Sequence, residues 1–301
     1  MSPETMLPSD ARYRWLYLDV AAGDVTVVVI FMLGAPFSPR YSVEARRGAP
    51  PLNHCAVNLA VYERGARLCW VLTEYPKAEL SERESVRIGQ SSWEYRKDGT
   101  AHVRVVDQTP WLGRPMEAEL VLTPESPVGP ELQLVEGVPH YWQPLAARAR
   151  AKVTVKSLGL ELEGRAYHDT NHGERLLGDG VEAWRWTRTH GGDVTRIVYE
   201  PQHEKPILVE ARADAVTHRR LDAELDVTLQ RSGWGLQVPA SLEPMAGGSI
   251  TAPHLLESSP FYARLEAPGP GLHAMSEVAD FKRFHSPWIR WMANFRTRGA
   301  S

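Results

Sequence analysis

The sequence predicts an all-β protein, with two consecutive antiparallel β-barrels followed by a short C-terminal helix. Apolar and polar residues alternate within 118–122, 153–162 and 221–229, which is the period of a strand with one solvated face. Twenty-three prolines and twenty-three glycines divide the 301 residues into short segments, as meandering antiparallel sheets require. One hairpin pattern occurs twice, which indicates that the barrel is duplicated.

The N-terminal region is predicted to consist of strands. Residues 1–15 contain charged side chains and no apolar run, so they predict no secretory signal. The longest apolar stretch, 25–33, has about half of the ~20 residues that a membrane helix needs. We therefore expect this stretch to be a buried strand.

The repeated hairpin pattern sets the expected domain division. Trp15 stands eight residues before Gly23-Asp24-Val25-Thr26, and Trp184 stands eight residues before Gly192-Asp193-Val194-Thr195. In both copies an aromatic strand leads into a Gly-Asp turn and then into a β-branched strand, as in a hairpin. Duplication of a barrel explains the constant offset. The expected domains are 1–176 and 177–301.

Charge and cysteine content restrict the partners and the compartment. The formal net charge of -3 gives no broad positive field, so we expect no nucleic-acid partner. Cys55 and Cys69 are the only cysteines, too few for a disulfide framework. A reducing, cytoplasmic location fits this content, and a single Cys55–Cys69 bridge remains an alternative.

The C-terminal segment 281–298 mixes aromatic side chains with five cations. One interpretation is a closing helix whose rings plug the second barrel. The other is a peripheral contact with the inner face of the cell membrane, with rings at the headgroups and cations toward the phosphates. The two interpretations are compatible, and we favour the closing helix.

Asp169 is the candidate acid. In an extended strand, alternate side chains share a face, so Tyr167, Asp169 and Asn171 point one way and the residues between them point the other way. If the first face looks into an apolar barrel, loss of hydration raises the pKa of Asp169. The carboxyl group then keeps a proton near neutral pH and can donate it.

Two other interpretations of Asp169 compete with this one. An isolated aspartate often caps a turn or pairs with a cation, here Arg165 or Arg188. His168 and His172 offer nitrogen ligands beside Asp169, but a metal site needs a third ligand and supporting residues at a clear spacing. We therefore expect no metal and, without a phosphate loop or dinucleotide fingerprint, no nucleotide cofactor.

A second candidate pair precedes Asp169 in the chain. His140 and Trp142 would share one face of a strand. An indole can stabilise a developing cation through its π face, and a histidine can take a proton from water. Ordinary barrel packing is the alternative for both residues.

These segments together resemble the carotenoid 1,2-hydratases, also called hydroxyneurosporene synthases, and their lipocalin-like relatives. The resemblance runs in collinear order over nearly the whole chain. The matching segments are Tyr13-Arg14-Trp15, Phe37-Ser38-Pro39-Arg40-Tyr41, Pro51-Leu52-Asn53-His54-Cys55-Ala56-Val57-Asn58-Leu59-Ala60-Val61-Tyr62, His140-Tyr141-Trp142-Gln143-Pro144, Ala149-Arg150, Gly164 to Gly173, Trp184-Arg185-Trp186 and Phe284 to Arg296.

The resemblance implies two lipocalin-like barrels and a hydro-lyase that needs no cofactor. The implied substrate is an acyclic carotene of the lycopene or neurosporene type, which takes up water across its terminal C1,2 double bond. The implied catalytic residues are Asp169 as proton donor, Tyr167, His140 and Trp142. The implied substrate-binding residues are His54, Asn58, Asn171, Trp184 and Trp186.

Two positions depart from the family pattern and keep other activities open. Asn53 replaces a common aspartate, and Ala166 replaces a common glycine. Hydration would begin with protonation of C2 by Asp169, and water would then add to the tertiary cation at C1. If water were excluded, the same site would act as a cyclase or pericyclase on a polyene. A non-catalytic carrier of an apolar ligand is the third alternative.

Overall fold

The computed structural model describes residues 6–81, 84–110, 112–222, 229–240, 253–296 and 298–299. Within these residues, thirteen strands form one sheet in the order β22-β4-β3-β2-β1-β12-β11-β9-β8-β7-β6-β5, and β10 pairs with β11 off this path. The bounds are β1 Tyr13–Ala22, β2 Val25–Leu33, β3 Cys55–Glu63, β4 Ala66–Tyr75, β5 Ala78–Ser81, β6 Ser85–Ile88, β7 Ser91–Tyr95, β8 Ala101–Gln108, β9 Pro115–Pro124, β10 Leu132–Val135, β11 Val138–Val155, β12 Leu160–Gly173 and β22 Arg298–Gly299.

A second sheet of seven strands has the order β16-β15-β14-β13-β21-β20-β19 in the described part of the chain. Its strands are β13 Ala183–Gly191, β14 Val194–Pro201, β15 Ile207–Ala211, β16 Val216–Arg220, β19 His254–Ser258, β20 Tyr262–Gly269 and β21 Leu272–Asp280. A separate pair is formed by β17 Leu229–Arg231 and β18 Gln237–Pro239, and the helices are α2 Pro39–Arg46, η1 Pro51–Asn53, η2 Lys156–Leu158, α3 Phe281–Phe284 and α4 Pro287–Arg296.

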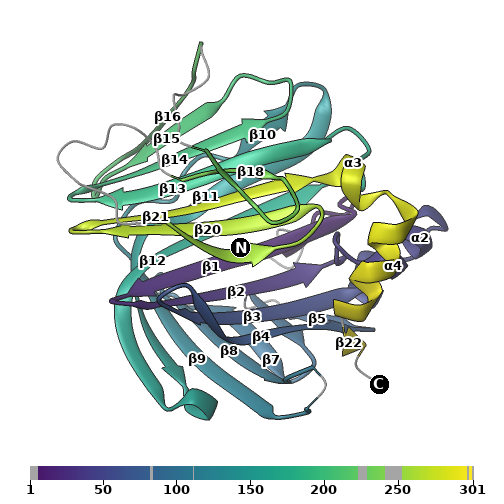
Figure 1. Cartoon of the computed structure of the whole chain (residues 1–301), viewed down its shortest axis with the longest axis horizontal. Helices are drawn as coiled ribbons and strands as arrows, with labels where there is room; N and C mark the ends of the chain where they lie inside the picture. The colour runs from purple at the N-terminus through teal and green to yellow at the C-terminus, as the bar shows by residue number, and fades with distance from the viewer. Residues whose placement is uncertain are drawn as a thin grey trace.

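The all-β prediction with a short C-terminal helix is confirmed. The first sheet curls into a half-barrel, and the second sheet, green and yellow in Figure 1, lies beside its purple strands. Helices α2, α3 and α4 gather at one edge of the two sheets (Figure 1). Most of the predicted strand 221–229 lies outside the described residues. The division into domains 1–176 and 177–301 stays a prediction.

Both copies of the repeated sequence pattern form the expected hairpin. β1 pairs with β2, and β13 pairs with β14, each through a Gly-Asp turn. Gly23 and Gly192 have φ values of 59° and 54°, the positive φ that a type II′ turn requires at its first central position. The sequence repeat therefore corresponds to equivalent hairpins in the two sheets.

The strands in the middle of the first sheet are buried on both faces. In β1, Leu16 and Leu18 belong to the core inside the curled sheet, whereas Trp15 and Tyr17 belong to a core shared with the second sheet. The predicted buried strand 25–33 is β2, and it is enclosed in the same way. Because side chains alternate along a strand, each of these strands contributes to two cores.

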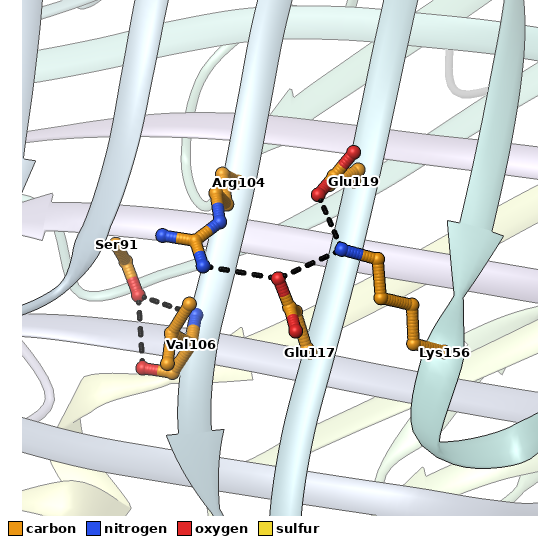
Figure 2. A network of polar contacts seen from close by, with 6 residues as sticks. All are labelled: Ser91, Arg104, Val106, Glu117, Glu119 and Lys156. Atoms are coloured by element: carbon orange, nitrogen blue, oxygen red, sulfur yellow. Dashed lines mark hydrogen bonds and ion pairs between the residues drawn. The ribbon is translucent and has the colours of Figure 1, made fainter.

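The strands at the far end of the half-barrel have one solvated face. Burial alternates residue by residue along β8 and β9. Figure 2 shows their outer face, where Glu117 on β9 accepts from Arg104 at 3.0 Å and from Lys156 at 3.0 Å. These pairs are exposed to solvent, which screens them, so they contribute little to stability. They mark the polar side of an amphipathic sheet.

Neither Cys55 nor Cys69 forms a disulfide, so the alternative of a bridge between them is wrong.

The C-terminal helix α4 has both buried and exposed apolar side chains. Ile289 is buried, whereas Trp288 and Trp291 are 51% and 64% exposed. Among the described helices, none has the length and apolar character needed to span a bilayer.

Candidate active site

Asp169 lies in the middle of β12, between β1 and β11, and points toward the second sheet. Tyr167 belongs to the core shared by the two sheets, and Asn171 contacts Tyr199 of β14. His168 points the other way and packs on Trp93 inside the half-barrel, with 4.9 Å between ring centroids. The predicted alternation of faces is therefore confirmed. The cavity that Asp169 lines, however, lies between the two sheets and not inside the first one.

Two hydrogen bonds hold the carboxyl group of Asp169. Oδ2 accepts from the Tyr167 hydroxyl at 2.7 Å and from Trp142 Nε1 at 2.8 Å. Burial raises the pKa of Asp169 to about 7, even though both hydrogen bonds favour the ionised form. The side chain is only 5% exposed. The group is thus poised to carry a proton near neutral pH.

Two of the alternative interpretations of Asp169, the turn cap and the pairing with Arg188, are wrong. Asp169 caps no turn, since it lies within a strand. Arg188 pairs instead with Asp19, Nη2 to Oδ1 at 2.7 Å, and both side chains are fully buried. The guanidinium of Arg188 also lies over the ring of Tyr167, 5.6 Å from its centroid. Arg188 therefore packs on the ring of Tyr167, whose hydroxyl bonds Asp169.

His140 is also buried, and both of its ring nitrogens have hydrogen-bond partners. Nδ1 shares a hydrogen bond with the Tyr13 hydroxyl, and Nε2 lies 3.4 Å from Asn171 Nδ2. The ring packs against both Trp15 and Trp184, with centroids 6.1 and 5.9 Å away. Burial lowers the pKa of His140 to about 3, so the imidazole is neutral at physiological pH.

Two adjoining cavities lie between the sheets. The larger one, about 120 Å³, has mainly apolar and aromatic walls, and includes Ala293 of α4. The smaller one, about 30 Å³, contains Asp169. Their shared wall consists of Trp15, Tyr17, Trp184 and Glu277. The arrangement places an acid next to an apolar chamber.

The structure brings most of the predicted site residues together. Asn171, Trp184 and Trp186 line the smaller cavity with Asp169, and Asn58 lines the larger one. Three predicted residues line neither cavity, namely Tyr167, Trp142 and His140. They lie behind the wall of the smaller cavity, where Tyr167 and Trp142 bond Asp169 and His140 bonds Asn171. His54 lies apart, with its ring packed on Tyr41 at 5.2 Å between centroids.

Several lining residues were not among the predicted site residues, and Tyr17 and Glu277 are two of them. Tyr17 follows Trp15 by two positions in a strand, so strand alternation could have placed it beside that tryptophan. Glu277 is one of two carboxylates in strand β21, and it has no neighbouring motif that would mark it. Its partner Arg264 comes from β20, and their ion pair, Nε to Oε1 at 2.8 Å, is formed only in the folded sheet.

The histidines beside Asp169 have structural partners. His168 Nδ1 lies 2.7 Å from the carbonyl oxygen of Tyr17, and its Nε2 bonds the Tyr95 hydroxyl at 2.7 Å. His172 Nε2 lies 3.0 Å from Glu131 Oε2. Within the described ranges, no group of three or more His, Cys, Asp or Glu side chains has metal-binding geometry.

Comparisons with known proteins point to one family. The model of the carotenoid hydratase family CrtC matches residues 29–299. The acyclic carotenoid 1,2-hydratase of Thiocapsa roseopersicina is 30% identical over 297 residues, covering 94% of this chain and 72% of the relative. The enzyme of the same name from Rhodobacter capsulatus is 27% identical, covering 89% of this chain and 96% of the relative.

A solved structure shares the fold. A Nitrosomonas europaea protein, solved as a candidate AttH, superposes with a TM-score of 0.61 at 12% identity, over 92% of this chain and 95% of the other. This likeness concerns the fold alone. Since the family model spans almost the whole chain, the chain belongs to the carotenoid hydratase family, whose members are hydro-lyases.

Proposed function

We propose that this protein adds water across the terminal C1,2 double bond of an acyclic carotene, without a cofactor. The observation that carries the proposal is a buried carboxyl group with its pKa raised to about 7, beside an apolar cavity. Protonation of an unactivated alkene requires an acid that stays protonated in an apolar site. The carotenoid hydratase relatives supply the substrate class.

The hydrogen bonds of Asp169 indicate which oxygen carries the proton. Oδ2 accepts from two donors, Tyr167 and Trp142, and the indole N–H can only donate. In the neutral acid, Oδ2 is therefore the carbonyl oxygen and Oδ1 carries the proton. Tyr167 and Trp142 would position the acid and stabilise the carboxylate that remains after proton transfer.

The cation at C1 would form among aromatic rings. Tyr17, Trp184 and Trp186 line the cavity that contains Asp169, and aromatic faces attract cations. His140, neutral and bonded on both ring nitrogens, is proposed as a positioning residue that holds Asn171 in this wall. Asn171 and Asn58 are proposed to contact the substrate.

Deuterium incorporation tests the proposed function. The purified protein is incubated with lycopene or neurosporene in D2O, and the products are analysed by mass spectrometry and NMR. We expect a 1-hydroxy carotene with deuterium at C2. A cyclised isomer would support the cyclase alternative, and unmodified ligand after long incubation would support the carrier. Asp169→Asn should keep the fold and lose the activity.

We also propose that α4 contacts the inner face of the cell membrane, where a carotene is dissolved. Trp288 and Trp291 point outward, while Ala293 of the same helix lines the larger cavity. A second pocket beside α4 shares Ser259, Phe261 and Ala293 with that cavity, which gives an apolar path from the helix to the site. The substrate would enter along this path.

A further inference from the structure

The smaller cavity has the size and the polar walls of a water site. Its volume is about 30 Å³, and one water molecule needs roughly 10–15 Å³ of cavity volume, so the cavity has room for about two water molecules. Five of its eight lining residues carry a hydroxyl, amide or carboxyl group, and the other three are tryptophans. The polar residues are Tyr17, Asp169, Asn171, Tyr199 and Glu277.

Two polar atoms in these walls have no protein partner. The Tyr17 hydroxyl and Trp186 Nε1 are buried and lack a hydrogen-bond partner within the described chain. Both side chains are more than nine-tenths buried, and both line the smaller cavity. Buried polar groups are almost always satisfied by protein or by ordered water. A water molecule in this cavity would accept from Trp186 and bond Tyr17.

The two sheets bring one carboxyl group each to this cavity. In the first sheet Tyr17 lies directly opposite Asp169 across β1 and β12, and in the second Trp186 lies opposite Glu277 across β13 and β21. Directly opposed residues have neighbouring side chains. The rings of Tyr17 and Trp186 pack together with 5.9 Å between centroids. The acid and Glu277 therefore occupy the same cavity from opposite sheets.

Glu277 differs from Asp169 in its partner. Arg264 Nε donates to Glu277 Oε1 at 2.8 Å, and Arg264 is 1% exposed. The guanidinium also binds Glu257, which lines only the larger cavity. Glu277 lines both cavities, so it lies where the apolar chamber meets the polar one.

We propose that the smaller cavity holds the water that adds to the substrate, and that Glu277 is the base that receives its proton. The inference rests on the proposed hydration. Asp169 transfers its Oδ1 proton to C2, and the alkene π electrons form the new C–H bond and leave the cation at C1. A lone pair of the cavity water forms the C1–O bond. The resulting oxonium gives one proton to the Glu277 carboxylate, and the C1 hydroxyl remains.

The resting state returns by a proton shift within the cavity. After addition, Asp169 is a carboxylate and Glu277 is a carboxylic acid. A second water between them would carry the proton back from Glu277 to Asp169, so that the net change is the addition of one water to the alkene. This arrangement gives the site two carboxyl groups with opposite roles, a recurrent device of acid–base enzymes.

The Glu277→Gln variant tests the base. We expect kcat to fall by about 10²- to 10⁴-fold, the usual contribution of a general base, with KM changed little. Glu200→Gln is the matched control, because Glu200 pairs with Arg185 at 3.1 Å in the same sheet and lines neither cavity. It should keep wild-type kcat. Glu277→Gln activity within threefold of wild type would overturn the role of Glu277, whereas an inactive wild type would refute hydration itself.

The water site is tested without turnover by a crystal structure of the wild-type protein at high resolution. We expect an ordered water within hydrogen-bond distance of the Tyr17 hydroxyl, Trp186 Nε1 and Glu277, and a dry cavity would overturn the inference. If Glu277→Gln fails to fold, Trp186→Phe keeps a ring and removes one donor. It should lower kcat about tenfold, the equivalent of one hydrogen bond of about 1.4 kcal/mol, and unchanged kcat would also overturn the inference.

Discussion

Trp142 donates its indole N–H to Asp169 Oδ2 at 2.8 Å, from the strand next to the one that carries the acid. The indole lies behind the cavity wall and stabilises the ionised carboxyl group, which opposes the effect of burial on the pKa of Asp169. Burial is therefore the main cause of the raised pKa of Asp169, and the hydrogen bonds from Tyr167 and Trp142, which line neither cavity, oppose it.

Replacing Trp142 by phenylalanine should shift the pH dependence of the reaction. Activity requires protonated Asp169, so in the wild type it should fall as the pH rises through the pKa of about 7. Loss of the indole donor raises that pKa further, so the fall should occur at higher pH in Trp142→Phe. The measurement is the pH profile of kcat with an acyclic carotene. A shift toward lower pH would contradict the assigned effect of Trp142.

Replacing Asp169 by asparagine should stabilise the protein at alkaline pH. The folded pKa of about 7 lies above the value of about 3.9 for an unfolded chain, so the unfolded state releases its proton first. The wild-type free energy of unfolding should then fall between about pH 4 and pH 7, by at most about 4 kcal/mol from this group. Urea unfolding at pH 5 and pH 8 measures this fall in the free energy of unfolding. An equal pH dependence in Asp169→Asn would contradict the raised pKa.

Removing one partner of the buried Arg188–Asp19 pair should lower the free energy of unfolding more than replacing both partners by apolar side chains. Arg188→Met leaves the Asp19 carboxylate buried and unpaired, and should lower the free energy of unfolding by about 3–5 kcal/mol. In the wild type, Arg188 Nε and Nη1 and Asp19 Oδ2 already lack partners within the described chain. Adding Asp19→Leu should therefore recover much of the loss. Urea unfolding of the single and double variants decides the point, and a double variant less stable than Arg188→Met would refute it.

Trp288 and Trp291 of α4 should contribute more to membrane binding than the neighbouring cations do. Arg283 is paired with Asp280 at 3.2 Å, and Arg290 bonds His285 at 2.6 Å. Trp288→Ser with Trp291→Ser should weaken sedimentation with phosphatidylglycerol-containing vesicles at least tenfold, since burying one large apolar side chain contributes about 1.5–3 kcal/mol. Leu112→Ser, at an apolar residue 70% exposed between β8 and β9, is the matched control. Equal binding of all three proteins would refute the contact.

Sequence periodicity alone determined the secondary structure and the faces of individual strands. The alternation around Asp169 placed Tyr167 and Asn171 on its side of β12, and the Gly-Asp turns after Trp15 and Trp184 marked two hairpins. These features are local, because they depend on the two-residue period of a strand and on the backbone freedom of glycine at a turn. The residues that carry the acid could therefore be named from the sequence.

Only the tertiary structure decided what each face of a strand meets. β1 and β12 are buried on both sides, and alternation cannot tell the core inside the half-barrel from the core between the sheets. Packing of the second sheet stacks Trp184 on Trp15 with 6.0 Å between centroids and brings Glu277 into the cavity of Asp169. More than one hundred positions separate Asp169 from Glu277 in the chain, and no local pattern links residues that far apart. The acid was visible in the sequence, and its partner across the cavity was not.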